Sequence, residues 1–287
     1  MTEAAISVHD LRYSYGDLQA VKGISFDVAP GEILGFLGPN GAGKSTTIRM
    51  LTGQLPPGGG SATVLGYDVG AGSSDMQARI GVCFEEKNLY INMSAKENLE
   101  FFASLYGIKD ADAEGVLRRV GLADRAKDRV KTFSKGMRQR MMISRAFINT
   151  PDVLFLDEPT DGLDPTTAAA IRTTIKEEAD RGVAVLLTTH DMFEADQLSD
   201  RVAFINDGEI VALDTPENLK LAYGTRAVKV RLRDGDGVRE ESLSLDDGAA
   251  SARLAELAAS PGLLTMHTEE ATLEHIFIQL TGRGLEG

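Results

Sequence analysis

Cysteine, long apolar runs and excess positive charge are the features that this chain has little of. Its single cysteine, Cys83, has no partner for an internal disulfide, which excludes a disulfide scaffold and fits a reducing cytoplasm. No apolar run approaches the ~20 residues of a membrane span. Residues 1–10 lack the basic region and the apolar core of a signal peptide. We therefore expect that any work at a membrane needs a partner inside the membrane.

Positive charge is scarce relative to negative charge. The chain has 30 lysine and arginine residues against 43 aspartate and glutamate residues, for a formal net charge of −13 at pH 7. Because phosphate backbones attract basic faces, this sign argues against wholesale binding of nucleic acid. It does not exclude a local basic patch. The 287 residues, of which 43% are hydrophobic, suffice for a large core plus a small appendage.

The most informative segment is rich in glycine and ends in a lysine and two hydroxyl residues. It is Gly38-Pro39-Asn40-Gly41-Ala42-Gly43-Lys44-Ser45-Thr46, which fits the nucleotide-phosphate pattern G-x-x-x-x-G-K-[ST]. The glycines allow close approach of the backbone to an anion, and successive N–H groups cradle the phosphates. In this pattern Lys44 reaches the outer phosphates and the Ser45 hydroxyl ligates Mg²⁺. The apolar run 33–37 predicts a buried strand before the loop, and residues 45–51 predict a helix whose N-terminus faces the phosphates.

A second motif combines an apolar strand with two carboxylates. The run 153–156 is apolar and is followed directly by Asp157 and Glu158. A carboxylate at a strand end can hold Mg²⁺, directly or through water, beside the loop hydroxyl. The next carboxylate can orient or deprotonate an attacking water. With the phosphate loop, this pair predicts hydrolysis of a nucleoside triphosphate rather than an acidic turn.

The order of expected elements predicts an α/β protein with a smaller second domain. Short β-type runs fill residues 5–36, a helical pattern runs from about 86 to 150, and strands alternate with helices over 151–215. Such alternation is typical of a mostly parallel sheet. After residue 222 the pattern changes to two alternating runs, a helix, a strand and a final amphipathic helix. We therefore expect one domain over 1–222 and a small α+β domain over 223–287.

Across residues 1–222 the chain resembles the ATP-binding subunits of ABC transporters. The motifs that carry the resemblance, besides the phosphate loop, are Tyr15 at the place of the adenine-stacking ring, Phe133-Ser134-Lys135-Gly136-Met137 at the place of the L-S-G-G-Q signature, the run from Asp157 through the D-loop to Asp164-Pro165, and Thr189-His190-Asp191 with the switch histidine. The resemblance implies the P-loop NTPase fold of ABC ATPases. That fold has an antiparallel β subdomain, a mostly parallel core sheet and a helical subdomain, here at about 86–150.

The resemblance also implies a homodimer with two ATP molecules between its chains. Each ATP then lies between one phosphate loop and the other chain's signature, here Ser134, Lys135, Gly136 and Met137. The implied roles are general base for Glu158, γ-phosphate sensor for His190, communication across the dimer for Asp164, and Mg²⁺ ligation for Ser45 and Asp157. The helix expected after the signature can direct its N-terminus at a γ-phosphate.

Two departures from the family pattern concern charge. Glu85 stands where the family has a glutamine, unless the alignment slips to Glu86, and we expect it in the metal shell. Its charge either tightens metal binding or adds repulsion against the phosphates. Lys135 replaces a signature glycine and Met137 a glutamine. The lysine either adds charge near the partner's nucleotide or points to solvent.

The segment 272–283 resembles the end of ATPase subunits from ABC-2-type exporters, which work with separately encoded permeases. We therefore expect an ATPase at the cytoplasmic face of the cell membrane that powers a polytopic permease for drugs, lipids, polysaccharides or other solutes, without nucleic acid. Its docking groove is expected over residues 85–102. The alternative is an ABC ATPase of translation or DNA repair. Such proteins usually carry two ATPase domains or a long coiled-coil insertion, whereas this chain has one phosphate loop and no extended heptad run.

Overall fold

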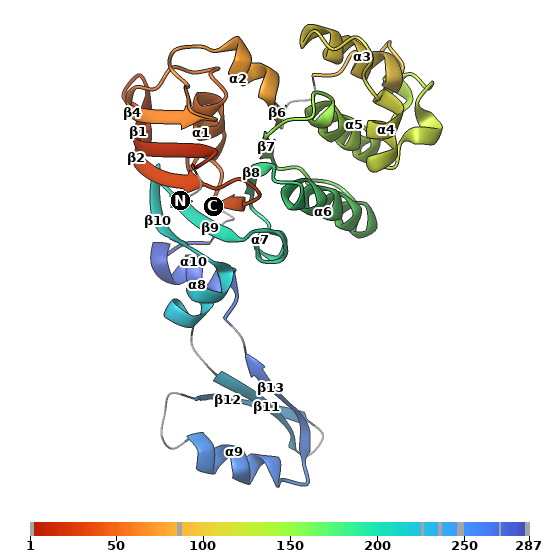
Figure 1. Cartoon of the computed structure of the whole chain (residues 1–287). Coiled ribbons are helices and arrows are strands. Elements are labelled where there is room, and N and C mark those ends of the chain that lie inside the picture. Colours follow the sequence, from red (N-terminus) through yellow and green to blue (C-terminus); the bar gives the residue numbers. More distant parts are fainter. Residues whose placement is uncertain are drawn as a thin grey trace. The chain divides into compact units, whose positions relative to one another are not determined.

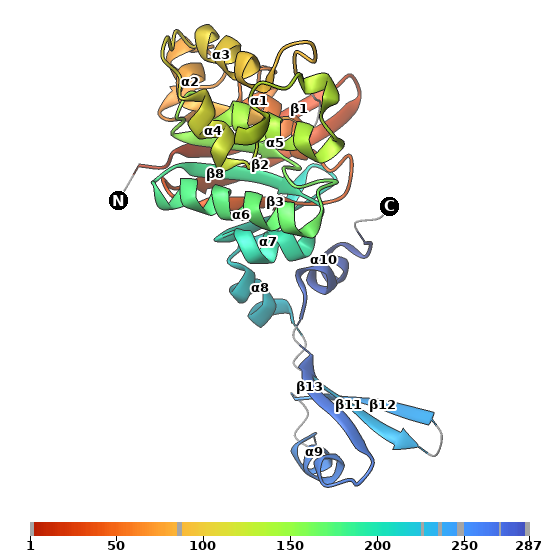
Figure 2. The same ribbon diagram turned by 90° about the vertical axis from the view of Figure 1, so that its right-hand side faces the viewer.

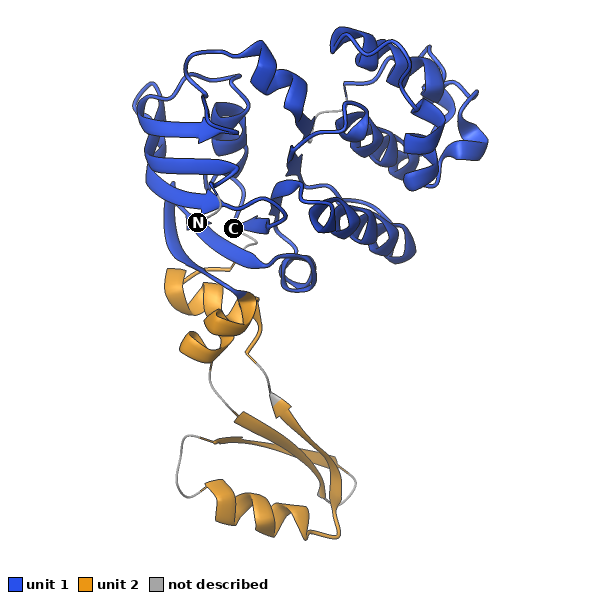
Figure 3. Cartoon of the chain, in the orientation of Figure 1, with its two compact units in different colours: residues 1–215, 285–287 blue, residues 216–284 orange. Residues whose placement is uncertain are grey.

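The chain divides into two compact units. The computed structural model describes residues 3–84, 88–224, 227–234, 237–245, 250–269 and 271–284 (Figure 1). Unit 1 comprises Met1–Thr215 and Leu285–Gly287, and unit 2 comprises Pro216–Gly284 (Figure 3). The domain boundary expected after residue 222 falls near the end of helix α8 (Pro216–Tyr223), whereas packing groups α8 with helix α10 (Leu273–Thr281) in unit 2.

The core of unit 1 is a mostly parallel sheet, as the sequence predicts. Among the described residues its strand order is β10-β9-β3-β8-β7-β6. The strands are β3 (Ile33–Leu37), β6 (Ile80–Cys83), β7 (Val153–Asp157), β8 (Ala184–Thr189), β9 (Arg201–Asn206) and β10 (Glu209–Asp214). The strands from β9 to β6 pair in parallel, and β10 pairs antiparallel with β9 at the edge. Expected strands at 33–37 and 153–156 are therefore confirmed as β3 and β7.

Helices and a second sheet cover this core sheet. The helices of unit 1 are α1 (Lys44–Leu51), α2 (Ser74–Arg79), α3 (Ala95–Leu105), α4 (Ala113–Arg119), α5 (Lys135–Phe147), α6 (Pro165–Asp180) and α7 (Met192–Leu198), with short 3₁₀ turns at Ala123–Arg125 and Val130–Thr132. Figure 1 shows α3, α4 and α5 grouped together as the predicted helical subdomain, and Figure 2 shows α6 lying along the strands. The short helix α2 is not signalled by any long apolar repeat.

Both faces of the core sheet are buried, which explains its apolar sequences. Every residue of β3, β7 and β8 is buried. Along β7, Val153 and Phe155 pack in the hydrophobic cluster that contains α1 residues, whereas Leu154 packs in the cluster that contains α6 residues. Successive side chains of a strand point to opposite faces, so a strand covered on both faces is apolar at every position.

The antiparallel sheet has the order β2-β1-β4-β5 within the described residues. Its strands are β1 (Ile6–Tyr15), β2 (Leu18–Val28), β4 (Gly59–Val64) and β5 (Tyr67–Asp68). A capping box stands at the start of α3. The Ser94 hydroxyl accepts from the Glu97 N–H at 3.2 Å, and the Glu97 carboxylate accepts from the Ser94 N–H at 2.7 Å.

Unit 2 is a small α+β arrangement, as the alternating pattern predicts. Its strands β11 (Ala227–Asp234), β12 (Gly237–Ser244) and β13 (Leu263–Glu269) form an antiparallel sheet with β11 in the centre. Helix α9 (Ala250–Ala258) lies between β12 and β13 in the chain, and α10 follows β13. Val228, Val230 and Leu232 of β11 are buried together with Leu257 of α9. One face of this sheet therefore packs on a helix, which produces the two-residue alternation of β11.

Candidate active site

Three parallel strands end side by side at one edge of the core sheet. Leu37 of β3 pairs with Thr189 of β8, and Asp157 of β7 pairs with Thr188 of β8. The segments that follow these strands carry the phosphate loop, Glu158 and His190. In open α/β sheets, ligands bind outside the carboxyl ends of the strands. The topology thus brings three distant sequence motifs to one place.

The phosphate loop, residues 38–46, connects β3 to α1. Gly43 forms the N-cap of α1 with a φ of 106°, a backbone conformation that favours glycine. A Cβ on Gly43 would lie 2.6 Å from the carbonyl oxygen of Ala20, and a Cβ on Gly38 would lie 2.1 Å from that of Ile205. Both positions therefore exclude a side chain. No side chain caps α1, so its N-terminus presents backbone N–H groups that suit an anion.

Lys44 places a nearly buried positive charge in this loop. The residue is 6% exposed. Its Nζ donates to the carbonyl oxygens of Gly38 at 2.6 Å and Pro39 at 3.2 Å. An ammonium group held on neutral carbonyls gains a stronger, charge-assisted partner when a phosphate arrives. The loop therefore combines a cation with a helix N-terminus, and both attract the same ligand.

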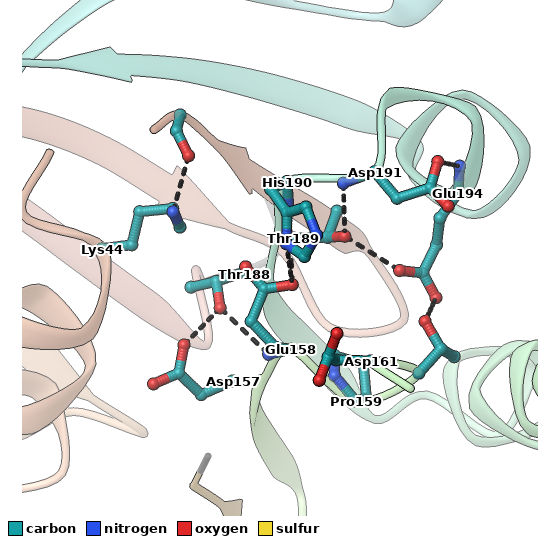
Figure 4. Close-up of polar contacts among 12 residues, drawn as sticks. Lys44, Asp157, Glu158, Pro159, Asp161, Thr188, Thr189, His190, Asp191 and Glu194 are labelled. Atoms are coloured by element: carbon teal, nitrogen blue, oxygen red, sulfur yellow. Dashed lines mark hydrogen bonds and ion pairs between the residues drawn. The ribbon is translucent and has the colours of Figure 1, made fainter. Parts of the chain in front are cut away.

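Asp157 is a buried carboxylate at the end of β7. It accepts a hydrogen bond from the Thr188 hydroxyl, and within the described part of the chain no basic side chain forms an ion pair with it (Figure 4). A buried carboxylate that lacks a cationic side chain suits a bound cation. Helix α1, whose second residue is Ser45, packs against β7. Hydroxyl and carboxylate oxygens are ligands that Mg²⁺ accepts, so Ser45 and Asp157 fit this ion.

Glu158 and His190 form a close pair at the same edge. Glu158 Oε2 lies 2.9 Å from His190 Nδ1 and accepts from the His190 backbone N–H at 3.4 Å (Figure 4). The Glu158 side chain is 14% exposed and that of His190 is 56% exposed. Burial raises the pKa of Glu158, while His190 and Lys44 oppose that shift. A carboxylate with a raised pKa accepts a proton from water more readily.

The backbone of Glu158 is also unusual. Its φ is 49°, a left-handed conformation that is uncommon for residues other than glycine. Such conformations persist where the surroundings hold them, and they concentrate at functional sites. Gln139 of α5, a buried residue that the sequence analysis missed, donates to the carbonyl oxygens of Glu158 at 3.3 Å and Pro159 at 3.2 Å. These two bonds attach the turn after β7 to the helix that follows the signature.

The signature segment opens α5 and lies beside the D-loop of its own chain. The Ser134 hydroxyl caps α5 by accepting from the Met137 N–H at 3.2 Å. Lys135 Nζ lies 3.4 Å from the Asp161 carboxylate, with most of its side chain exposed. A Cβ on Gly136 would lie 3.3 Å from the Leu163 side chain. The lysine thus pairs with the D-loop of its own chain.

Two other expected site residues lie at the start of α6 and at the end of β1. Asp164 caps α6 by accepting from the Thr167 N–H at 3.0 Å and the Thr167 hydroxyl at 2.6 Å, and these bonds lower the pKa of Asp164. Tyr15 ends β1 of the antiparallel sheet, exposed, with its ring centroid 4.8 Å from that of Tyr13. Glu85 lies outside the described residues.

A buried acid of α7 is a second residue that the sequence analysis missed. Glu194 accepts hydrogen bonds from the hydroxyls of Thr160 and Thr189. Burial raises the pKa of Glu194, and the two hydroxyls oppose that shift. The only sequence signal is an acid on a short helix after His190, which is indistinguishable from a solvent-exposed acid without the fold.

A phosphate loop on a parallel sheet, followed at the same edge by an acid pair and a histidine, defines the class of P-loop ATPases. A family model described as ABC transporter matches residues 21–161. The fluoroquinolones export ATP-binding protein of Mycobacterium tuberculosis (strain ATCC 25618 / H37Rv) is 46% identical over 275 residues, covering 96% of this chain and 91% of that protein. The linearmycin resistance ATP-binding protein LnrL of Bacillus subtilis (strain 168) is 37% identical, covering 98% of this chain and 99% of that protein.

Solved structures agree with these relatives. The structure of the ATP binding subunit of an ABC transporter superposes with a TM-score of 0.70 at 30% identity, covering 77% of this chain and 93% of that one. The dimeric post-hydrolysis structure of the ATP-binding cassette MJ0796, bound to ADP and Pi, superposes with a TM-score of 0.67 at 25% identity, covering 73% and 98%. The chain therefore belongs to the family of ABC transporter ATP-binding proteins. It is the ATP-hydrolysing subunit of an export transporter of the ABC-2 type. None of the helices in the described residues has the length and apolarity to span a membrane.

Proposed function

We propose that two copies of this chain close on two ATP molecules, each held between the phosphate loop of one copy and the signature segment of the other. The N-terminus of α5 supports this arrangement, because a helix N-terminus attracts an anion and Gly136 carries no side chain there. A structural relative is a dimer bound to ADP and Pi, which lends support from comparison. Asp164, at the start of α6, then lies in the segment that communicates with the partner.

The observation that carries the mechanism is the Glu158–His190 pair, which lies at the carboxyl ends of β7 and β8 next to the phosphate loop. Lys44 and the loop N–H groups bind the outer phosphates, and Tyr15 stacks on the adenine. Ser45 and Asp157 hold Mg²⁺, which supplies positive charge to the phosphates when it is bound. Glu158 takes a proton from the attacking water. His190 orients the Glu158 carboxylate and contacts the γ-phosphate, so that catalysis consists of positioning and proton transfer.

The same subunit docks on a polytopic permease at the cytoplasmic face of the membrane. Tyr90 and Ile91 are exposed beside α3, and the Tyr90 ring centroid lies 4.8 Å from that of Phe101. This apolar surface belongs to the described part of the expected docking groove, together with the partly exposed Leu89 and Met93. Relatives are named for fluoroquinolones export and for daunorubicin/doxorubicin resistance. We therefore propose a drug-like, amphiphilic cargo for the transporter that this chain powers.

The hydrolysis mechanism is tested with Glu158→Gln. Loss of the general base lowers ATP turnover by about 10²- to 10⁴-fold. ATP binding persists, and light scattering detects a stable ATP-bound dimer. The matched control is Glu177→Gln on the exposed face of α6, which leaves turnover unchanged. Hydrolysis at the wild-type rate by the Glu158 variant would refute the role of this residue.

The transport role is tested by isolating the tagged chain from detergent-solubilised membranes and identifying its partners by mass spectrometry. Co-purification of a polytopic permease is expected, and efflux of a fluorescent fluoroquinolone from cells that express both proteins then tests the cargo. Cells with the Glu158→Gln chain serve as the control and retain the compound. Recovery of ribosomes or repair proteins in place of a permease contradicts the proposal.

A further inference from the structure

One buried carboxylate joins the two segments that carry the acid–histidine pair. Glu194 of α7 is 1% exposed. Its Oε1 accepts from the Thr160 hydroxyl, and its Oε2 accepts from the Thr189 hydroxyl at 2.9 Å (Figure 4). Thr160 follows Glu158 by two residues, and Thr189 directly precedes His190. Each partner of the Glu158–His190 pair is therefore tied, through a neighbouring threonine, to the same side chain.

The direction of these hydrogen bonds is set by the backbone of α7. Thr189 Oγ1 accepts from the Asp191 N–H at 3.0 Å, so its own hydrogen is available for Glu194. Asp191 in turn caps α7 and accepts from the Glu194 N–H at 3.1 Å. Glu194 is thus held at the N-terminus of a capped helix while both of its carboxylate oxygens are engaged. A carboxylate fixed in this way transmits its position to both threonines.

We propose that Glu194 is a positioning residue for ATP hydrolysis, which bridges Thr160 and Thr189 and thereby keeps Glu158 and His190 within hydrogen-bond distance. This inference rests on the proposed roles of Glu158 and His190. The left-handed backbone at Glu158 must be held by its surroundings. Gln139 holds the carbonyl oxygens of this turn from α5, and Glu194 holds the turn through Thr160 from α7. Loss of either set of hydrogen bonds lets the Glu158 carboxylate move away from the position in which it takes a proton from the attacking water.

The chemistry of the bridge defines informative substitutions. Alanine at position 194 leaves the hydroxyls of the buried Thr189 and the half-buried Thr160 without their acceptor. Glutamine keeps an oxygen for Thr189, and its amide N–H group can donate to the Thr160 hydroxyl after that hydroxyl rotates. Thr160→Val removes one arm of the bridge at nearly constant volume, and Thr160→Ser retains the hydroxyl. The glutamine and serine variants are therefore the conservative counterparts of the alanine and valine variants.

The experiment measures kcat and KM for ATP of the full chain, with thermal unfolding recorded for each variant. We expect Glu194→Ala and Thr160→Val to lower kcat by about 10- to 100-fold, because small misplacement of a reacting group costs rates of this order. The KM for ATP stays within about twofold, since Lys44 and the phosphate loop are untouched. Glu194→Gln and Thr160→Ser retain most of the wild-type kcat. The double variant Glu194→Ala/Thr160→Val is no slower than Glu194→Ala alone, because both changes break the same connection.

A second buried acid supplies the control for stability. Glu178 of α6 is 4% exposed and forms ion pairs with Arg119 and Arg181. Neither arginine is one of the candidate site residues. Glu178→Gln lowers the unfolding temperature and leaves kcat unchanged. The proposal is overturned if Glu194→Ala keeps a wild-type kcat, if it raises KM alone, or if Glu178→Gln lowers kcat equally.

The outcome does not depend on one variant. If Glu194→Ala does not fold, the contrast between Thr160→Val and Thr160→Ser decides: a slow valine variant beside an active serine variant supports the bridge, and equal rates overturn it. Failure of the proposed mechanism is recognised separately, because Glu158→Gln then hydrolyses ATP at the wild-type rate. An inactive Glu158→Gln beside a fully active Glu194→Ala overturns only the positioning role.

Discussion

The core sheet of unit 1 contains strands that are buried at every position, whereas the strands of the unit 2 sheet mix apolar with charged residues. All residues of β8 are buried, and its side chains enter clusters on both faces of the sheet. In the sheet of unit 2, β12 has no fully buried residue, and among the described residues of the three strands the buried side chains come from the central strand β11. A parallel sheet is covered on both faces, whereas an antiparallel sheet can leave one face to solvent.

This difference bears on where the chemistry lies. Unit 1 holds a glycine-lined loop without a capping side chain, a buried Asp157 and a left-handed Glu158. Each of these features is unfavourable alone and persists only in rigid surroundings. Unit 2 instead contains partly exposed ion pairs, such as Arg253 with Glu241. The densely packed sheet thus supports strained functional groups that a one-sided sheet of this size does not.

The largest expected contrast concerns Lys44 and a lysine of unit 2. Lys44→Ala removes charge-assisted hydrogen bonds to phosphate, each worth about 1.5–3 kcal/mol, and so weakens ATP binding by about 10- to 100-fold. Lys229→Ala on β11 leaves ATP affinity unchanged. Isothermal titration with ATP measures both variants. Equal affinity of the Lys44 variant and the wild type would contradict the assignment of the loop.

A matched pair of valines sharpens the comparison of packing. Val185 of β8 and Val230 of β11 are both fully buried. Because the cost of a cavity depends on how far the surroundings relax, Val185→Ala should lower the free energy of unfolding by about 2–3 kcal/mol and Val230→Ala by about 1 kcal/mol. Calorimetric unfolding of the two variants tests this order. A larger loss from Val230→Ala would show that the small sheet is packed as tightly as the core sheet.

The smallest expected contrast is the response of two carboxyls to pH. Burial raises the pKa of Glu194 above its ordinary value of 4.5, whereas Arg253 lowers that of Glu241. The stability linked to Glu194 is fully present below the unfolded pKa and is lost as pH rises through the folded pKa. The stability linked to Glu241 is present above the unfolded pKa and is lost as pH falls through the folded pKa.

Glutamine variants separate these two contributions. As pH rises from 4.5, the wild-type chain should lose stability relative to Glu194→Gln. As pH falls below 4.5, it should lose its stability advantage over Glu241→Gln. Denaturant unfolding across this range measures both differences. Curves that change in the same direction would contradict the assigned causes of the shifts.

Much of the architecture follows from local sequence patterns. The runs 33–37 and 153–156, the alternating run of β11 and the capping box of α3 are each recognisable because one strand, one helix turn or one face decides them. The strands β1 and β2 extend beyond their apolar runs, because pairing within a hairpin continues through polar residues. The roles of the candidate site residues remain predictions that the proposed variants test.

The sequence by itself determined the phosphate loop, the acid pair after an apolar strand and the order of the ABC motifs, because each is a short run whose residue types carry the chemistry. Only the tertiary structure decided that Glu158 meets His190, that Gln139 holds the turn after β7, and that Glu194 joins two threonines. These contacts depend on the order β3-β8-β7 and on the register of parallel strands. Parallel strands are brought together by long crossovers, so no local sequence pattern specifies which side chains meet at their ends.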